Sequence, residues 1–464
     1  MTDSTPASST PAHSTPAAST LAQLRSDALA ILRATLADCS IPAAFARCLR
    51  VEGRTIHRLC GTSGPSALAL DSFSQLFVVS LGKAAVPMLD ALLAILPAEI
   101  PLRGLCAAPS LPTRQHAGIT YFAAGHPLPN ADSFAAARAA LHLLHTADAS
   151  TLVLFLISGG GSALCELPLD PTIPLEDTRR FHQALIGCGA PIADLNAMRQ
   201  SFSAVKGGRL AAAAGPATQL SLLISDVPEN ALEALASGPT LPAQPSHEQL
   251  AHLLDHYRLW PQLPTAVGRF FQQTLANPAA DPLLPDPSRC MHDLLLSDAD
   301  LARAALHHAQ SLGYATTVDN RCDDWDYAQA AEWLTDRLQQ LRVNTPRTCL
   351  LSTGEVTVTL PAAPGTGGRN QQFALESARL LADSPSAPTV ILSAGTDGVD
   401  GNSPAAGAIV DTATWSRAHA LALDPDAALH SCNAWPLFQA LGDTITTGPT
   451  GHNLRDLRLL LAAG

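Results

Sequence analysis

The segment VLFLISGGGSALCELP places three consecutive glycines directly after an apolar run. An apolar run of this length predicts a buried strand, and glycines allow the backbone after it to approach another group closely. The amides of Gly159, Gly160 and Gly161 could therefore surround a phosphate, with hydrogen bonds from the hydroxyls of Ser158 and Ser162. The alternative is a tight turn that packs against a neighbouring strand. The segment is not a Walker A loop, since no Gly-Lys-Thr or Gly-Lys-Ser follows it.

Two lysines stand beside glycines where the chain could bind negative charge. Lys83 follows the glycine turn of SLGKAAV at the expected start of a helix, where free backbone N–H groups already favour anions. Lys206 lies in SAVKGGRLA, again before an expected helix. Each lysine could contact a phosphate. Each could also be an ordinary solvated charge, because a cation at a helix N-terminus is otherwise slightly unfavourable.

Three carboxylates lie in or after apolar segments. Asp226 ends the run LSLLISD, and Asp397 follows TVILSAGT. A carboxylate at such a strand end could accept a proton or hold Mg²⁺ through water, whereas Asp226 could equally cap a turn. Glu355, in the strand-like STGEVTV, needs either a partner or a solvent-filled cleft.

Two further glycine-rich loops, GTGGRNQQ and GPTGHN, carry Arg369 and Asn453. An arginine side chain suits bidentate capture of a carboxylate or a phosphate. His126, in AGHPLP, could orient a ligand or pack within its own loop. Anion-binding loops, a lysine, an arginine and several strand-end carboxylates together fit phosphoryl transfer, in which positioning and charge neutralisation supply the catalysis.

Strand-like and helix-like segments alternate along the chain, which predicts an α/β fold with a mostly parallel sheet. In open α/β sheets, ligands bind beyond the carboxyl ends of strands, and the loops above follow such ends. The length of 464 residues exceeds what one hydrophobic core usually serves, and a proline-rich middle separates two α/β regions. We expect a disordered tail at 1–20, an N-terminal domain at 21–265 and a C-terminal domain at 266–464.

The composition excludes several classes of protein. A formal net charge of -12 argues against general binding to nucleic acid or to an anionic membrane surface. Hydrophobic residues make up 47% of the chain, so a large core is available. The ten cysteines are scattered without a CxxC pair or zinc-site spacing, which indicates free thiols in a reducing cytoplasm. No apolar run of roughly 18 residues predicts a transmembrane helix.

The ordered motifs resemble the class II glycerate 2-kinase family, which contains DUF4147 and MOFRL domains and whose members were often named hydroxypyruvate reductases. The resemblance runs from about Leu81 to the C-terminus. It rests on LGKAA, AGHPLPNADS, ISGGGSALCELP, SAVKGGRLA, ISDVPENALEALASGPT, GEVTV, GTGGRNQQFAL, SAGTDGVDGNSPAAGAIVD and GPTGHNLRDL.

The resemblance implies an ATP-dependent, Mg²⁺-using kinase that converts D-glycerate, or a related hydroxy acid, to 2-phosphoglycerate. It implies two α/β domains, the N-terminal one Rossmann-like, with the active site in the cleft between them. The family's active-site positions fall here on Lys83, Glu355, Arg369, Asp397 and Asn453. Lys83 and Arg369 would neutralise the transferred phosphoryl group, and Asp397 would hold metal or take the hydroxyl proton. Glu355 and Asn453 would position ligands.

For the cofactor, we expect ATP to contact the loop 158–162, Lys206 and Asp226, and Mg²⁺ to bind Asp226 and Asp397. We expect a small-molecule substrate, no nucleic-acid or membrane partner and a cytoplasmic location, and we leave the oligomeric state open.

Three positions depart from the family pattern. Glu229–Asn230 stand for Gly-Asp, Ser403–Pro404 stand for Thr-Asp, and His452 stands for Thr. The missing carboxylate motivates one alternative, a non-catalytic ligand-binding protein on a decayed kinase scaffold. A hydroxypyruvate reductase, the other alternative, would need a GxGxxG fingerprint after a strand, which SGGGSAL does not match.

Overall fold

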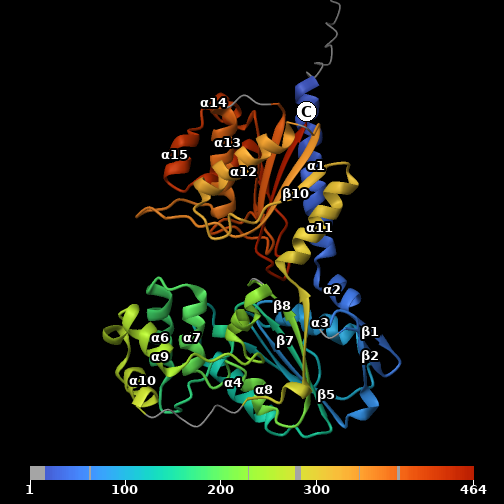
Figure 1. The fold of residues 1–464 in the computed structure, drawn as a ribbon, viewed down its shortest axis with the longest axis vertical. Helices are drawn as coiled ribbons and strands as arrows, with labels where there is room; N and C mark the ends of the chain where they lie inside the picture. The colour runs from blue at the N-terminus through green and yellow to red at the C-terminus, as the bar shows by residue number, and fades with distance from the viewer. Residues whose placement is uncertain are drawn as a thin grey trace, which may run out of the picture. The chain divides into compact units, whose positions relative to one another are not determined.

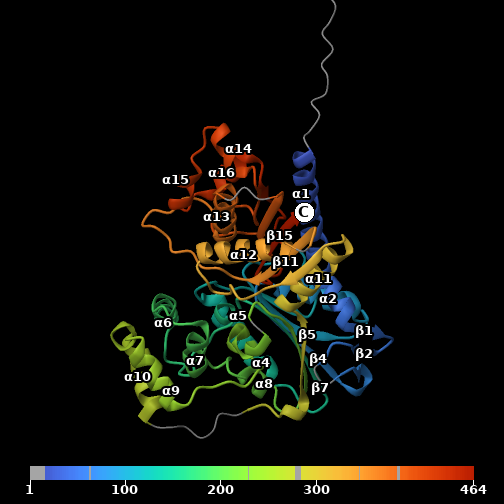
Figure 2. The same cartoon turned by 45° about the horizontal axis from the view of Figure 1, so that its top comes forward.

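The computed structural model describes residues 16–61, 64–227, 229–276, 284–343, 345–383 and 387–463, which fold into two compact units. The N-terminal unit comprises residues 37–301 and 450–454. The C-terminal unit comprises the chain up to residue 36, residues 302–449 and the chain from 455 onward. Each unit contains a six-stranded sheet covered by helices, as Figure 1 and Figure 2 show from two directions. The expected α/β class is therefore confirmed.

The N-terminal unit is built on a wholly parallel sheet in the order β6-β5-β4-β7-β8-β9. The strands are β4 (Gln75–Leu81), β5 (Leu102–Ala108), β6 (Ile119–Ala123), β7 (Thr151–Ser158), β8 (Thr218–Ile224) and β9 (Cys290–Leu296). The helices are α2 (Ile41–Cys48), α3 (Ala85–Ile95), α4 (Ala131–Leu144), α5 (Gly161–Leu164), α6 (Leu175–Gly187), α7 (Ile192–Phe202), α8 (Arg209–Ala213), α9 (His247–His256) and α10 (Thr265–Ala276). A separate antiparallel sheet contains β1 (Leu49–Glu52), β2 (Thr55–Arg58) and β3 (Ser66–Ala69).

Successive side chains of a strand point to opposite faces of the sheet, and helices cover both faces here. Phe77 and Val79 of β4 and Val153 and Phe155 of β7 point to one face, where they share an apolar core with α4 and α8. The helix α3 packs on the other face (Figure 1). Because both faces are buried, the central strands read as nearly continuous apolar runs.

The order of the strands reverses between β4 and β7. From β4 the chain adds β5 and β6 on one side, and from β7 it adds β8 and β9 on the other. This is the order of the Rossmann fold, whose ligands bind outside the carboxyl ends of the strands at the point of reversal. The predicted Rossmann-like domain is thus confirmed.

The C-terminal unit contains a mixed sheet in the order β10-β11-β15-β12-β13-β14. Its strands are β10 (Ala315–Val318), β11 (Arg347–Gly354), β12 (Thr389–Gly395), β13 (Gly407–Asp411), β14 (Thr444–Ile445) and β15 (Asp456–Ala463). Its helices are α11 (Asp298–Ser311), α12 (Tyr327–Arg342), α13 (Arg369–Asp383), α14 (Thr414–Ala420), α15 (Pro425–His430) and α16 (Ala434–Leu441), together with α1 (Pro16–Asp38). The helices α12 to α16 share one core with the sheet, and α1 and α11 lie on its other side (Figure 1).

The last strand, β15, lies in the middle of this sheet. It runs antiparallel to both β11 and β12, and Asp456 at its start is the register partner of Gly354 and of Gly395. The beginning of β15 therefore meets the ends of β11 and β12 at one edge. The sequence motif GPTGHNLRDL contains Asp456, but the central strand that begins there was not expected.

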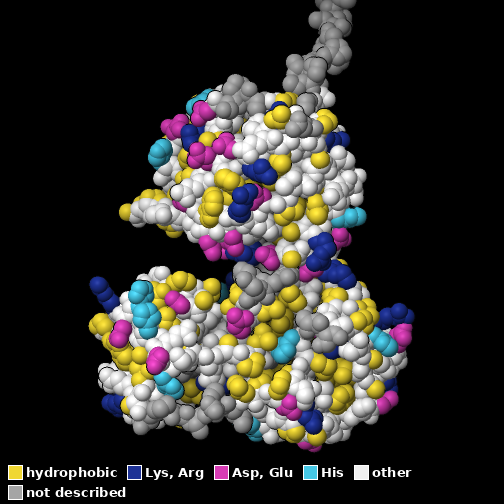
Figure 3. Space-filling model, in the orientation of Figure 1, with side chains coloured by type: hydrophobic (Ala, Val, Ile, Leu, Met, Phe, Trp, Pro, Cys, Tyr) yellow, Lys and Arg dark blue, Asp and Glu magenta, His cyan; other side chains and the backbone are white. Residues whose placement is uncertain are grey.

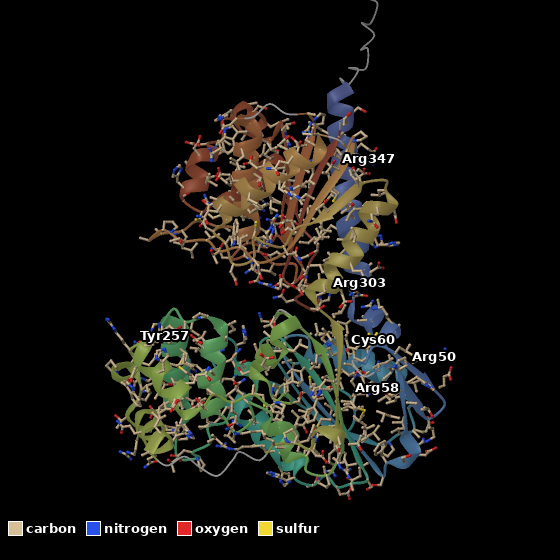
Figure 4. The ribbon with its side chains drawn as sticks, in the orientation of Figure 1. Arg50, Arg58, Cys60, Tyr257, Arg303 and Arg347 are labelled. Carbon is tan, nitrogen blue, oxygen red and sulfur yellow. The ribbon has the colours of Figure 1, made fainter. Side chains whose placement is uncertain are left out.

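The first helix belongs to the C-terminal unit, contrary to the expected domain at 21–265. Arg25 pairs with Asp411 at 2.5 Å and also with Asp443. Asp27 accepts from Arg347 at 2.5 Å and from the hydroxyl of Tyr314 at 2.7 Å. Figure 4 shows Arg347 beside α1. These partners lie some hundreds of residues away in sequence, so local patterns could not reveal them.

Two other expected boundaries change. The helix α1 begins at Pro16, so residues 16–20 of the expected tail are helical, and residues 1–15 lie outside the described part. The compact N-terminal unit also extends beyond 265, because β9 completes its parallel sheet by pairing with β8. The short segment 450–454 returns to that unit.

The surface and the cysteines agree with a folded, mixed-charge protein. On the face drawn in Figure 3, acidic, basic and hydrophobic side chains are interspersed over each unit. All ten cysteines are free.

Among the described residues no single helix is long and apolar enough to cross a membrane. Ser19–Asp38 and Ile41–Cys48 pass that test only as a pair bent by 55°.

We expect Arg25→Met to destabilise the C-terminal unit by about 2 kcal/mol, because two buried carboxylates lose their shared cation while each keeps other hydrogen bonds. Urea unfolding followed by tryptophan fluorescence would measure this. Of the five tryptophans, all but Trp260 lie in the C-terminal unit. Arg33→Met, at an exposed position of the same helix, is the control and should unfold like the parent. Equal midpoints for the two variants would contradict the role of Arg25.

Candidate active site

The turn after β4 and the loop after β7 are joined by their backbones at the reversal point of the parallel sheet. The N–H of Lys83 donates to the carbonyl of Gly159 at 2.9 Å, and the N–H of Ala84 donates to the Ser158 hydroxyl at 3.0 Å. Gly82, with φ +125°, makes this closeness possible, because a Cβ there would overlap Ser158. The two loops therefore form one surface.

Three side chains from different strand ends converge on two adjacent glycines of that surface. A Cβ on Gly159 would overlap the carboxylate of Asp226, which follows β8. A Cβ on Gly160 would lie 3.0 Å from Cγ of Lys83 and 3.2 Å from Cδ2 of His126, which follows β6. The glycines thus permit Lys83, His126 and Asp226 to surround exposed backbone, as an anion-binding loop requires.

Lys83 places a cationic side chain at this edge of the sheet. Lys83 is exposed, and its ammonium has no hydrogen-bond or ion-pair partner among the described residues. Partial burial of the ring, together with the positive charge of Lys83, lowers the pKa of His126. At neutral pH we therefore expect an uncharged imidazole beside Lys83.

Both serines of the expected phosphate loop have protein partners. The hydroxyl of Ser158 is buried and accepts from Ala84, so it supports the turn that carries Lys83. The hydroxyl of Ser162 lies 2.8 Å from that of Ser237, which in turn donates to Asn196. These contacts make the two serines supports of the loop.

Lys206 is buried and has an internal partner. Its ammonium donates to Glu166 at 2.6 Å, and Glu166 also contacts Nε2 of His182 at 2.8 Å. Burial would raise the pKa of Glu166, but Lys206 and His182 lower it to about 2. Glu166 lies two residues beyond α5, the short helix that follows the glycine loop, so this ion pair anchors the segment after that helix. We therefore place Lys206 among the residues that position the loop, which differs from the expected contact with ATP.

The expected residue Asn453 lies in the N-terminal unit, although its sequence neighbours build the other sheet. Gly451, in the same segment, approaches Pro87 in the first turn of α3, with 3.6 Å between an added Cβ and Cγ of Pro87. His452 is buried there, its Nδ1 has no partner, and burial lowers its pKa to about 4. The segment 450–454 therefore brings Asn453 to the unit that carries Lys83.

In the C-terminal unit, Arg369 holds two carboxylates at the edge where β15 begins. Its Nη1 donates to Glu355 at 2.8 Å, and its Nε donates to Asp456 at 2.6 Å. Burial raises the pKa of Glu355, and the charge of Asp456 adds to the rise while Arg369 opposes it. Asp456 has no distinctive context in the sequence, and only the register of β15 reveals it.

Asp397 follows β12 at the same edge, as expected. Its Oδ1 would lie 3.3 Å from a Cβ on Gly395, and Oδ1 of Asp456 would lie 3.5 Å from the same point. Arg455 forms a bidentate ion pair with Asp323, whose Oδ1 also accepts from the N–H of Glu355 at 3.0 Å. Arg369, Arg455 and the buried Arg458 thus lie among four carboxylates here, so carboxylates outnumber guanidinium groups at this edge.

The first turn of α13 is capped by the protein itself. Asp400 accepts from the backbone N–H groups of Asn370 and Gln371 at 3.0 and 2.9 Å, and burial raises its pKa to about 6. Ser403 accepts from the Gln371 side chain at 2.6 Å. This helix end therefore serves to fix Arg369, since its amides are already occupied.

The acidic side chains of the two units can be compared with the ligands that the expected Mg²⁺ needs. Among the described residues, no group of three or more acidic, histidine or cysteine side chains could hold a metal ion alone. Asp226 and Asp397 belong to different units. Mg²⁺ in kinases is commonly held by one or two carboxylates together with substrate phosphates. A single carboxylate such as Asp226 or Asp397 has the chemistry of such a ligand.

Comparison with known proteins identifies the family. The family described as a domain of unknown function, DUF4147, matches residues 27–272, and the MOFRL family matches residues 348–456. The glycerate 2-kinase of Pyrococcus horikoshii is 33% identical over 387 residues, 82% of this chain and 86% of that protein. The chain belongs to the glycerate 2-kinase family. It is thus an enzyme of the phosphotransferase class.

Two solved structures share the fold of this glycerate 2-kinase family member. A protein from Pyrococcus horikoshii and a glycerate kinase from Thermotoga maritima each give a TM-score of 0.79, at 29% and 28% identity. They cover 95% of this chain, and the matches span 99% and 100% of those chains. A relative from Agrobacterium vitis is provisionally named a hydroxypyruvate reductase; it is 32% identical over 389 residues, 83% of this chain and 98% of that protein.

We expect His452 to weaken the folded enzyme in acid. Its pKa of about 4 lies below the ordinary value of 6.5, so between these pH values the unfolded chain binds a proton that the folded chain does not. Stability from this group is therefore present above pH 6.5 and is lost as the pH falls toward 4. Relative to His452→Gln, the parent should lose about 2 kcal/mol more between pH 7 and 4.5 in urea unfolding. Parallel pH curves for the two proteins would disprove this.

Proposed function

We propose that this enzyme transfers the terminal phosphoryl group of ATP to the 2-hydroxyl of D-glycerate and releases ADP and 2-phosphoglycerate. The observation that carries the proposal is the exposed ammonium of Lys83 beside Gly159 and Gly160 at the reversal point of the Rossmann-like sheet. Phosphates bind at such points through backbone amides and a nearby cation. Relatives named glycerate 2-kinase and D-glycerate 2-kinase support the choice of substrate.

In this proposal the edge of the N-terminal unit binds the phosphates. The glycine backbone approaches their oxygens, and Lys83 offsets the charge that develops while the phosphoryl group moves. A new bond forms between the substrate hydroxyl oxygen and the terminal phosphorus, and the bond to ADP breaks. Asn453, from the segment 450–454 of the same unit, would donate to a ligand oxygen. The charged pair of Lys206 and Glu166 keeps the loop in place.

The acidic edge of the C-terminal unit would bind the cation that accompanies these phosphates. Arg369 is already engaged by Glu355 and Asp456, so its main contribution is to orient them and to expose part of its positive charge. Mg²⁺, when bound, would neutralise phosphate charge, and Asp397 and Asp226 are the carboxylates that would hold it. The placement of the active site between the two units and the cytoplasmic location stay predictions.

The turn after the first strand separates this proposal from an oxidoreductase. In dinucleotide-binding Rossmann domains, that turn carries the glycine fingerprint that approaches the pyrophosphate. Here it reads Gly82, Lys83, Ala84 and Ala85, so it offers a cation and one glycine in place of the fingerprint. A kinase fits this turn better than a nicotinamide enzyme does.

The direct test is the product. Purified enzyme with ATP, Mg²⁺ and D-glycerate should form a phosphate ester, and phosphorus NMR should place the phosphate on C2. Oxidation of NADH in the presence of hydroxypyruvate, without phosphorylated product, would support the reductase instead. Binding of ATP with no product from any of a panel of hydroxy acids would support a non-catalytic protein and refute the proposal.

We expect Lys83→Ala to lower kcat on D-glycerate by at least about 10²-fold, because it removes the positive charge beside the transferred group. The fold should persist, since the side chain is exposed. Arg138→Ala, at an exposed position of α4, is the control for loss of a surface cation and should retain parental kcat. Circular dichroism melting would check that all three proteins are folded. Near-parental kcat in Lys83→Ala would reject the assigned role.

A further inference from the structure

The loop between β6 and α4, residues 124–130, is held by hydrogen bonds at the edge of the parallel sheet where the carboxyl ends of its strands lie. Asn130 caps α4 by accepting from the N–H of Ser133 at 2.9 Å, and its side-chain amide donates back to the carbonyl of Ala123 at 3.0 Å. The hydroxyl of Ser133 accepts from the N–H of Gly125 at 3.1 Å. Both ends of the loop are thus fixed by one capping box.

His126 is the side chain that this loop presents at the edge. Its Nε2 would lie 3.4 Å from a Cβ on Gly160, and the same point lies 3.0 Å from Cγ of Lys83. The side chain is only partly buried, and neither ring nitrogen has a hydrogen-bond partner among the described residues. Because the protein itself uses neither nitrogen, the ring is available to contact a ligand at this edge.

We propose that His126 is a catalytic residue that accepts the proton of the substrate hydroxyl during phosphoryl transfer; this rests on the proposed function. As the hydroxyl oxygen bonds to the terminal phosphorus, the bond from phosphorus to the bridging oxygen breaks, and ADP keeps that electron pair. The hydroxyl proton passes to the unprotonated ring nitrogen of His126. The imidazolium then releases the proton to solvent after the product leaves.

The surroundings of His126 suit a proton acceptor. Lys83 faces the ring across Gly160, and Asp226 lies against the neighbouring Gly159. Partial burial and the charge of Lys83 lower the pKa of His126, so the ring is neutral and able to accept a proton at pH 7. A base works best when its pKa lies near the operating pH, which favours an imidazole over a carboxylate.

The test compares His126→Gln with His145→Gln, which changes an exposed histidine beyond the far end of α4. With D-glycerate and ATP, His126→Gln should lower kcat by about 10²-fold or more and leave the KM for ATP within about threefold. In the parent, kcat/KM should fall in acid through a pKa below 6.5, and this fall should disappear in His126→Gln. The control variant should match the parent in both respects.

Three results would overturn the inference. These are parental kcat in His126→Gln, a raised KM with unchanged kcat, and a lower kcat with the acid fall still present. In the last two cases His126 would bind or position the substrate without taking its proton. Melting temperatures of both variants would check the fold, and added imidazole should partly restore His126→Ala. A parent enzyme that forms no phosphorylated product would refute the proposed function, and this inference with it.

Discussion

The candidate site depends on one contact between backbones, the hydrogen bond from the N–H of Lys83 to the carbonyl of Gly159. It joins the turn after β4 to the loop after β7, the two strands at which the sheet order reverses. At such a point of reversal, ligands bind outside the carboxyl ends of the strands. Because Gly82, Gly159 and Gly160 have no Cβ, a lysine, a histidine and an aspartate can pack closely around the backbone of these two loops.

Charge is distributed differently over the two strand edges that carry the candidate residues. The parallel sheet presents Lys83 and a neutral His126, with the buried pair of Glu166 and Lys206 behind the loop. The mixed sheet presents an acidic cluster ordered by the guanidinium of Arg369. The first edge suits anionic phosphates and the second suits a cation that accompanies them. Each preference follows from the residue types at that edge, and each is a property of one unit alone.

Local patterns in the sequence predicted the α/β class, the strand before the triple glycine and the residues at strand ends. They failed wherever a partner was distant along the chain. The buried partner of Lys206 is Glu166, and a lone glutamate inside the apolar stretch ALCELP was the available signal, since a buried charge requires a partner. Asp456 gave no such signal, because its place at the acidic edge follows from the register of β15. The membership of α1 in the C-terminal unit depends likewise on ion pairs across the whole chain.

The central position of β15 has a consequence for biosynthesis. Residues 456–463 separate β11 from β12, so neither strand has this neighbour until β15 has been translated. The helix α1 is translated before these strands, and the carboxylates that its Arg25 meets are translated hundreds of codons later. The parallel sheet, which is complete at β9, can form while translation continues. The pairs β10–β11 and β12–β13 can form earlier, but the six-stranded sheet of the C-terminal unit is completed only when β15 inserts between them.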